Sequence, residues 1–170
     1  EKIGWRGSST YELYFENCEL DADHLLGPVG SGLRQTLAQV NTGRILIGAL
    51  ALGILQGSLE RSVAYMKERK AFGKELAAFQ ALQFKVADMA VHAHLARLAL
   101  YDAAARKDAG LPFDQEASMG KLFATEQAMH AALQAVHIHG GNGIMTEFPV
   151  SRALGDAKVL EIVEGTSEIQ

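Results

Sequence analysis

Residues 164–170, with the sequence EGTSEIQ, combine a carboxylate with a short, hydroxyl-rich turn. An apolar run that includes Val159, Leu160, Ile162 and Val163 comes directly before them. A carboxylate held on a turn beside apolar surface loses part of its hydration, which makes it a stronger base. Most turns of this kind are only solvated helix ends, so the turn alone does not identify a catalytic residue. Glu164 is a candidate general base because other motifs accompany it in the chain.

Four further segments accompany Glu164 in a fixed order. They are ERKAFGK at 68–74 with FQALQ at 79–83, GGNG at 140–143, FPVSR at 148–152 and DAK at 156–158. In this order and spacing the chain resembles the C-terminal helical domain of the acyl-CoA dehydrogenases. The resemblance extends over essentially all 170 residues.

The resemblance implies FAD-dependent α,β-dehydrogenation of an acyl-CoA thioester to the trans-2-enoyl-CoA. Glu164 would remove the α-proton while a hydride leaves the β-carbon for the flavin. Because an α-proton beside a thioester is weakly acidic, the base must be desolvated and the enolate stabilised. In the family an electron-transferring flavoprotein then accepts the electrons, and the subunits form a homotetramer that is a dimer of dimers.

The resemblance also assigns the binding residues. The expected FAD contacts are Arg69, Phe72, Gln80, His137, Gly140, Gly141, Thr166 and Glu168. The expected acyl-CoA contacts are Asn41, Arg44 and Gly165. Arg69, Phe72 and Gln80 would reach the FAD of a neighbouring subunit.

The residue types allow simpler interpretations of the same positions. Arg69 lies in a cationic helix end, which the helix dipole alone favours, although its planar guanidinium also fits a pyrophosphate. Gly140 and Gly141 can act as helix C-caps, or can let backbone approach a ligand closely. Arg44 lies in an apolar helix and needs either a structural partner or a ligand.

Four positions bear on how far the family pattern holds. Some members carry their base at the position of Gly43, which has no side chain to serve, and this leaves Glu164. His137 stands where the family commonly has glutamine, and Val163 stands where many relatives have an aromatic residue. Gly155 replaces a common arginine, a change without a functional explanation at this level.

Composition excludes several other classes of function. A net charge of −4 and a pI near 5.9 argue against a nucleic-acid partner, because no basic stripe is present. Cys18 is the only cysteine, so a reducing intracellular compartment is expected, the bacterial cytoplasm or the mitochondrial matrix. The histidine pairs 92/94 and 137/139 are two residues apart and point to different sides of a helix, so no metal site is expected. The apolar run 45–55 is shorter than the roughly 20 residues of a membrane span. We therefore expect a core helix there, buried on most sides.

Helical periodicity predicts an all-α, up-and-down bundle of three long helices and one or two short ones. One helix follows the glycine-rich loop 27–32, a second spans about 78–108, a third follows Asp114 as N-cap, and Pro149 opens a short fourth. The alternation in 11–16 predicts a β-strand, which is not stable alone. We therefore expect residues 1–30 to be the end and exit of a β domain, and 31–170 to be the C-terminal bundle.

Because the chain starts without methionine and stops inside a motif, we expect it to be part of a longer protein and inactive alone. Two alternatives remain open. One is an acyl-CoA oxidase or another flavoenzyme on the same scaffold. The other is a non-catalytic bundle that serves only for oligomerisation, against which the placement of Glu164 and Arg69 at breaks between helices argues.

Overall fold

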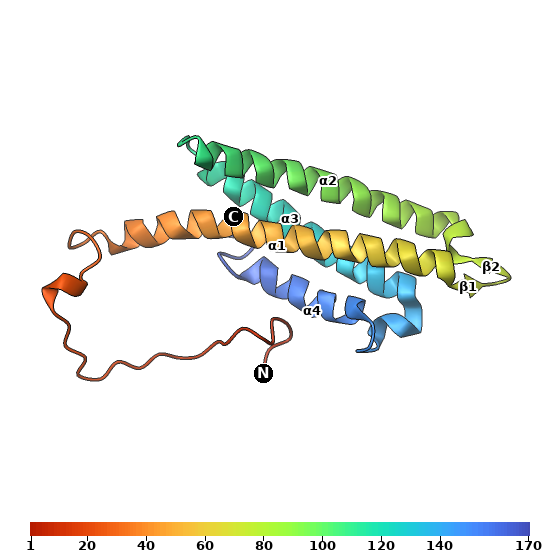
Figure 1. Cartoon of the computed structure of the whole chain (residues 1–170), viewed down its shortest axis with the longest axis horizontal. Coiled ribbons are helices and arrows are strands. Elements are labelled where there is room, and N and C mark those ends of the chain that lie inside the picture. Colours follow the sequence, from red (N-terminus) through yellow and green to blue (C-terminus); the bar gives the residue numbers. More distant parts are fainter.

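The computed structural model describes residues 1–170 and contains four helices of alternating direction (Figure 1). The α-helices are α1 (Gly32–Glu68), α2 (Gln80–Asp108), α3 (Asp114–His139) and α4 (Pro149–Ile162). A hairpin of β1 (Lys70–Ala71) and β2 (Lys74–Glu75) joins α1 to α2, and its strands pair in antiparallel register, Lys70 with Glu75 and Ala71 with Lys74. Three 3-10 turns complete the chain, η1 (Ala22–His24), η2 (Leu76–Ala78) and η3 (Gly140–Ile144). The up-and-down bundle predicted from periodicity is confirmed.

Chain breakers end the helices where the sequence predicts. Gly110 follows α2 with a φ of 68°, and Gly140 ends α3 with a φ of 58°, conformations that glycine adopts without steric cost. Pro149 occupies the first turn of α4. The prediction for Asp114 is wrong in detail, because Asp114 is the first helical residue and Phe113 takes the cap position. The carboxylate of Asp114 instead accepts a hydrogen bond from Asn41 on α1 at 2.7 Å.

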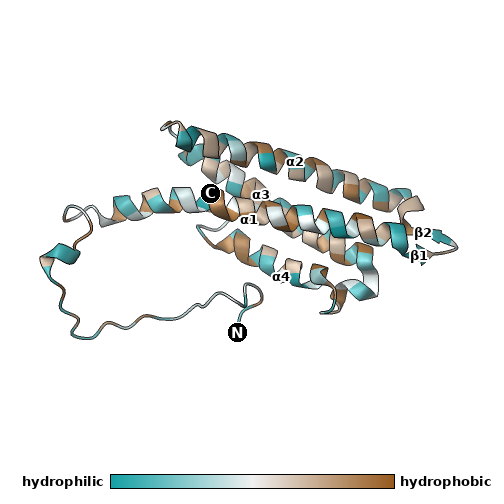
Figure 2. Cartoon of the chain, in the orientation of Figure 1, coloured by the Kyte–Doolittle hydropathy of each residue, from teal (hydrophilic) through white to brown (hydrophobic).

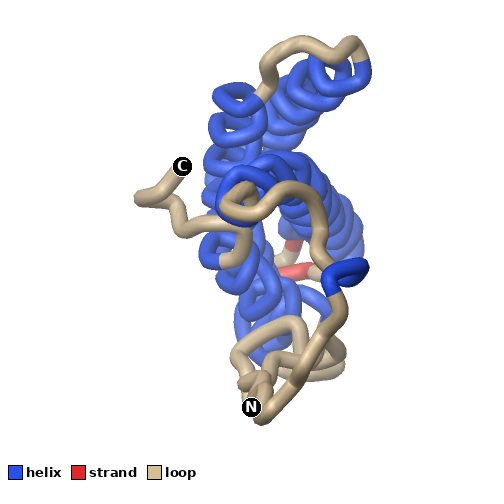
Figure 3. Tube along the Cα trace, turned by 90° about the vertical axis from the view of Figure 1, so that its left-hand side faces the viewer, coloured by secondary structure: helices blue, strands red, loops and turns tan.

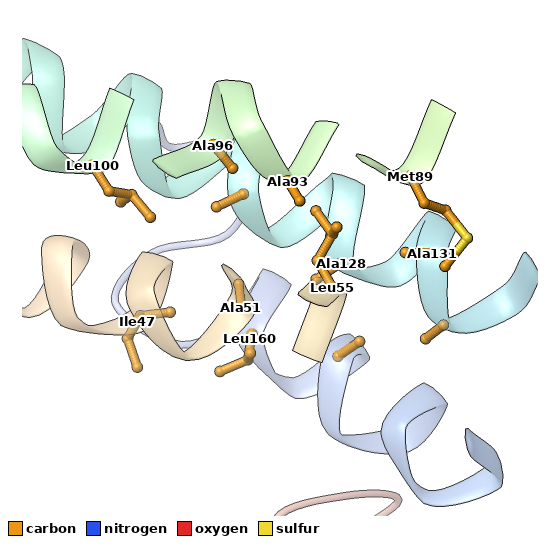
Figure 4. Packing of buried hydrophobic residues seen from close by; sticks show 13 residues of the cluster. Ile47, Ala51, Leu55, Met89, Ala93, Ala96, Leu100, Ala128, Ala131 and Leu160 are labelled. Atoms are coloured by element: carbon orange, nitrogen blue, oxygen red, sulfur yellow. The ribbon is translucent and has the colours of Figure 1, made fainter. Parts of the chain in front are cut away.

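The core consists mainly of small side chains, which lets the helices approach closely. Thirteen buried residues form one cluster across all four helices, and Figure 4 shows its alanines facing the few larger members. Leu100 of α2 fits between two glycines. A Cβ on Gly48 of α1 would lie 2.3 Å from Leu100 Cδ2, and one on Gly120 of α3 would lie 3.2 Å from the same atom. This packing fixes α1 against α3 about one turn from Arg44.

The expectation that the apolar part of α1 is buried on most sides is wrong for this chain. Ile47, Ala51 and Leu55 are buried, but Leu46 and Leu50 remain 63% and 51% exposed. Figure 2 shows hydrophobic residues along this helix, whereas the β1–β2 hairpin is mostly hydrophilic. By length and mean hydropathy alone, α1 is also the one helix that could cross a membrane. The core helix of a bundle meets the same criterion, and the packing of α1 against α2, α3 and α4 favours that interpretation.

Residues 1–31 leave the bundle and form no strand, so the strand predicted at 11–16 is absent from this structure. A strand needs a hydrogen-bonding partner, and none lies beside this segment; Tyr11 and Leu13 are about four-fifths exposed. The first residues instead return to α4 (Figure 1), and Figure 3 shows the N-terminal segment as a loop with one short helical turn. At α4 the Trp5 backbone N–H donates to Asp156 Oδ1 at 2.7 Å.

Candidate functional site

Glu164 lies two residues beyond the end of α4, on a turn with an unusual backbone. Its φ is 55°, in the left-handed region that is unfavourable for a residue with a side chain, and Gly165 follows with a φ of 98°. A non-glycine residue in this region costs roughly 1–2 kcal/mol, so surrounding contacts must hold it there.

Three side chains hold this turn through its carbonyl oxygens. Arg44 Nε donates to the Glu164 carbonyl at 3.4 Å. Gln170 Nε2 donates to the carbonyls of Glu164 and Gly165 at 3.1 and 2.8 Å. Lys121 Nζ donates to the Gly165 carbonyl at 2.6 Å. We name residues 163–170 the base loop.

The carboxylate of Glu164 lies directly over Gly43 of α1. A Cβ built on Gly43 would lie 2.7 Å from Glu164 Cδ and 2.8 and 3.1 Å from its two carboxylate oxygens. These distances are shorter than ordinary van der Waals contact, so any larger residue at position 43 would displace the carboxylate. Positions 43 and 164, the two at which the sequence analysis considered a base, therefore lie against each other in the structure.

Arg44 is partly buried and hydrogen-bonded within the chain, as the structural alternative for it required. Its Nη1 donates to Asn41 Oδ1 at 3.1 Å and to Ser118 Oγ of α3 at 2.9 Å. Nη2 makes no hydrogen bond to protein, and it lies 3.7 Å from the place of a Cβ on Gly165. Three residues predicted to contact acyl-CoA, Asn41, Arg44 and Gly165, thus gather around the base loop.

Lys121 of α3 was missed by sequence reasoning. It has no solvent exposure and is the largest fully buried side chain of the chain. Its ammonium also donates to the Glu161 carbonyl in the last turn of α4 at 3.2 Å. Burial lowers the pKa of Lys121, and the positive charge of Arg44 lowers it further. The signal was present, because Lys121 has helical spacing with the buried Ala117, Ala124 and Thr125.

A second cluster forms at the other end of α1. Arg69 lines an open pocket of about 350 Å³ together with Gly140 and Gly141, from the turn after α3. A Cβ on either glycine would meet no atom within 4 Å, so their backbone faces open space. Tyr65 and Asn142 line the same pocket, and Asn142 Nδ2 donates to the Tyr65 hydroxyl at 3.0 Å. Three residues predicted to contact FAD, distant in sequence, thus share one pocket.

The same pocket contains a buried histidine. His139 stacks on Tyr65 with ring centroids 4.2 Å apart and hydrogen-bonds the Ala135 carbonyl through Nδ1 at 2.8 Å. Burial lowers the pKa of the His139 imidazole. His137, the residue that the sequence analysis selected, is exposed and does not line this pocket.

Of the other predicted FAD contacts, Phe72, Gln80 and Glu168 are exposed and Thr166 is half-buried. Phe72, at the tip of the hairpin, is 95% exposed with a φ of 50°, and Gln80 begins α2. Thr166 and Glu168 lie on the base loop instead, where a hydrogen bond with the Thr166 side chain lowers the pKa of Glu168.

The two clusters are far apart in one chain. Arg44 and Arg69 are separated by about two-thirds of the 37 residues of α1, which corresponds to about 38 Å at the rise of an α-helix. Glu164 lies at the first cluster and Gly140 at the second.

Comparison with known proteins identifies the family. Residues 30–170 match the family model described as "Acyl-CoA dehydrogenase, C-terminal domain". The chain belongs to the acyl-CoA dehydrogenase family. A relative, "Probable acyl-CoA dehydrogenase YngJ" of Bacillus subtilis (strain 168), is 51% identical over 170 residues, which are 100% of this chain and 45% of the relative. The chain therefore spans less than half the length of this acyl-CoA dehydrogenase.

Two solved structures have the same fold as this chain. Butyryl-CoA dehydrogenase from Megasphaera elsdenii superposes with a TM-score of 0.98 at 40% identity, over 99% of this chain and 44% of that one. A second chain has a TM-score of 0.98 at 42% identity, over 99% of this chain and 44% of that one. It is described as "Electron transferring flavoprotein of Acidaminococcus fermentans: Towards a mechanism of flavin-based electron bifurcation".

The structure shows the surroundings of Gly155 and Val163, two positions that depart from the acyl-CoA dehydrogenase pattern. Gly155 faces the N-terminal segment, where a Cβ would lie 2.5 Å from the Ile3 carbonyl oxygen. A Cβ on Gly4 would in turn lie 2.3 Å from the Gly155 carbonyl oxygen. Glycine at 155 thus permits a backbone contact that arginine would block. Val163 packs against the hydrophobic core.

Proposed function

We propose that the full-length protein carrying this chain catalyses the FAD-dependent α,β-dehydrogenation of an acyl-CoA thioester to the trans-2-enoyl-CoA. The observation that supports this most strongly is the placement of Glu164. Its carboxylate is presented over a glycine, on a turn whose carbonyls are held by Arg44, Gln170 and Lys121. Such a turn holds a base in one position, and a pure scaffold gains nothing from the strained backbone of Glu164.

In this mechanism the carboxylate of Glu164 takes the α-proton of the bound thioester. Bound FAD would supply the acceptor for the hydride that leaves the β-carbon. The backbone N–H of the same glutamate is oriented by the turn and contributes to stabilising the enolate. The two N–H donors on Nη2 of Arg44 are available to the acyl-CoA, since the other donors of this guanidinium are engaged within the chain.

Among the residues of the second cluster, Arg69 fits the pyrophosphate of FAD, and Gly140 and Gly141 fit its adenosine portion. Arg69 supplies a planar, charged donor, while Gly140 and Gly141 leave the backbone accessible at the end of α3. Arg69, Gly140, Gly141 and Asn142 would hold these parts of the cofactor, whereas Phe72, Gln80 and His137 do not line this pocket and would contact FAD outside it. Thr166 and Glu168 would meet the flavin end at the base loop.

The separation of about 38 Å between the Glu164 cluster and the Arg69 cluster indicates that two subunits contribute to each FAD site. Arg69 is too remote from Glu164 to share a compact site with it inside one subunit. We therefore assign Arg69 to the FAD of a neighbouring subunit, in a homotetramer built as a dimer of dimers. Residues 1–30 then form the exit from a preceding β domain, and residues 31–170 form the C-terminal bundle.

The electron acceptor is an electron-transferring flavoprotein in this proposal, which the description of the Acidaminococcus fermentans chain supports. A single cysteine and a net charge of −4 favour a reducing intracellular compartment and no nucleic-acid partner. Anaerobic and aerobic turnover would separate a dehydrogenase from an oxidase, because only an oxidase reoxidises efficiently with oxygen.

The test is Glu164→Gln in the full-length protein, with Glu60→Gln on the exposed part of α1 as the matched control. Bleaching of the flavin absorbance by acyl-CoA under anaerobic conditions reports the reaction directly. Loss of a general base should slow bleaching by at least ~10²–10⁴-fold while FAD content and melting temperature stay unchanged. If Glu164→Gln keeps more than a tenth of the wild-type rate, the base lies elsewhere.

A further inference from the structure

Lys121 is a buried cation that neither contacts the reacting groups nor takes part in a chemical step of the proposed mechanism, although it holds a carbonyl of the base loop. Its side chain has no solvent exposure, and no carboxylate oxygen lies within ion-pair distance of its ammonium. Placing an ammonium in a protein interior is costly unless its hydrogen bonds are satisfied. A nonpolar side chain of the same length would fill this space without that cost, so packing alone does not explain a lysine.

The hydrogen bonds of Lys121 connect two successive parts of the chain. Nζ donates to the Glu161 carbonyl, in the last turn of α4, at 3.2 Å and to the Gly165 carbonyl, on the base loop, at 2.6 Å. Carbonyls at a helix C-terminus lack intrahelical partners and carry the negative end of the helix dipole, so a cation is favoured there. Glu164 lies between these two carbonyls in sequence.

These two hydrogen bonds restrain the backbone on either side of Glu164. We propose that Lys121 is a positioning residue: its ammonium joins the end of α4 to the base loop and so fixes the Glu164 carboxylate over Gly43. This inference rests on the proposed function, because it gives Glu164 the role of base. Arg44 and Gln170 hold the same turn at the Glu164 carbonyl, but only Lys121 joins it to α4.

The test replaces Lys121 with Met in the full-length, FAD-loaded protein. Met keeps the length and the apolar stem and removes the three N–H donors. Lys85→Met is the matched control, because Lys85 on α2 also donates to a residue of another helix, Gln134, away from the base loop. A misplacement of about 1 Å at a reacting group costs about 10²-fold in rate. We expect kcat to fall by about this factor in Lys121→Met, with KM and FAD content close to those of wild type.

Amide hydrogen exchange supplies a readout that does not depend on turnover. Amides of residues 163–169 should exchange at least tenfold faster in Lys121→Met than in wild type or Lys85→Met, while those in the middle of α3 stay protected. Lys121→Gln, which keeps an N–H donor without the charge, should fall between Met and wild type in both readouts. If Lys121→Met does not fold, the same two readouts on Lys121→Gln decide.

If amide exchange in the base loop is unchanged in Lys121→Met and its kcat stays within twofold of wild type, Lys121 is not a positioning residue. Glu164→Gln, measured in the same series, separates this failure from a failure of the proposed function. An active Glu164→Gln enzyme would remove the role of Glu164 as base, whereas an inactive one beside a fully active Lys121→Met enzyme would remove only the role of Lys121.

Discussion

Replacing Gly43 with alanine should displace the carboxylate of Glu164, the proposed base, while leaving the fold intact. The added Cβ would lie 2.7 Å from Glu164 Cδ, whereas carbon atoms in contact prefer about 3.5–4.0 Å. The carboxylate must therefore move by about 1 Å. Because it is the end of a flexible side chain, this movement costs the fold little. Alanine also favours a helix over glycine by roughly 0.5–1 kcal/mol, so Gly43→Ala should not lower the melting temperature.

The effect on the reaction should be large by comparison. A 1 Å misplacement corresponds to about 10²-fold in rate, or about 2.7 kcal/mol of activation free energy. The assay is anaerobic bleaching of the flavin by acyl-CoA in the full-length protein, with FAD content and thermal unfolding measured in parallel. Gly53→Ala is the matched control, because it lies on the same helix and its Cβ would meet no atom within 4 Å.

The expected pattern is a variant at least as stable as wild type and much slower. If Gly43→Ala bleaches within twofold of the wild-type rate, the observed position of the Glu164 carboxylate is not the one that reacts. A comparable loss in Gly53→Ala would show that helix propensity, and not the contact with Glu164, causes the effect.

Three further outcomes follow from other contacts. Arg69→Ala should reduce the FAD retained after gel filtration more than Lys70→Ala does, and equal FAD content in the two variants would leave Arg69 as an ordinary helix-end cation. Gly155→Arg should release the first residues of the chain from α4, seen as faster amide exchange at Trp5, because even a Cβ at 155 would lie 2.5 Å from the Ile3 carbonyl oxygen. His139 has a lowered pKa in the folded protein, so the stabilisation from its neutral form is complete above pH ~6.5 and is lost as the pH falls toward the folded-state value. Urea unfolding of His139→Gln should therefore depend less on pH below about 6.5 than that of wild type, and an identical dependence would contradict this linkage.

Local signals predicted the helices well. Alternating three-four spacing, the Gly110–Pro112 break and Pro149 act within a few residues, so their effects can be read without knowledge of the fold. The prediction of a strand at 11–16 is wrong because strand formation depends on more than local sequence. The alternation in 11–16 is a local property, but a strand forms only with a partner, and this chain provides none.

The exposed half of α1 illustrates the same limit. The composition of 45–55 predicts an apolar environment, but it does not identify what supplies that environment. In this chain α3 and its neighbours cover Ile47 and Ala51, while Leu46 and Leu50 face outward. In the proposed tetramer these residues have other domains or subunits to pack against.

For the candidate site, too, the sequence predicted one part and not the other. Motifs located Glu164, Arg69 and the glycine pair, but not the contacts that orient them. Lys121 is 43 positions before Glu164, and Arg44 is 120 positions from the carbonyl to which it donates. Contacts of this range arise only when α1, α3 and α4 pack together, so the reason for the lysine appears in the structure and not in the motif.

The two clusters also depend on different parts of the fold. The base loop rests on the crossing of α1 with α3, where Leu100 fits between Gly48 and Gly120, next to Lys121. The Arg69 pocket depends instead on Tyr65, His139 and the turn after α3, about 38 Å away along α1. In the proposed tetramer each subunit would supply its base loop to one cofactor and its Arg69 pocket to another, and α1 would then be the element that connects neighbouring active sites. A bundle with an alanine-rich, closely packed core suits that role, because close packing transmits position along the helix with little distortion.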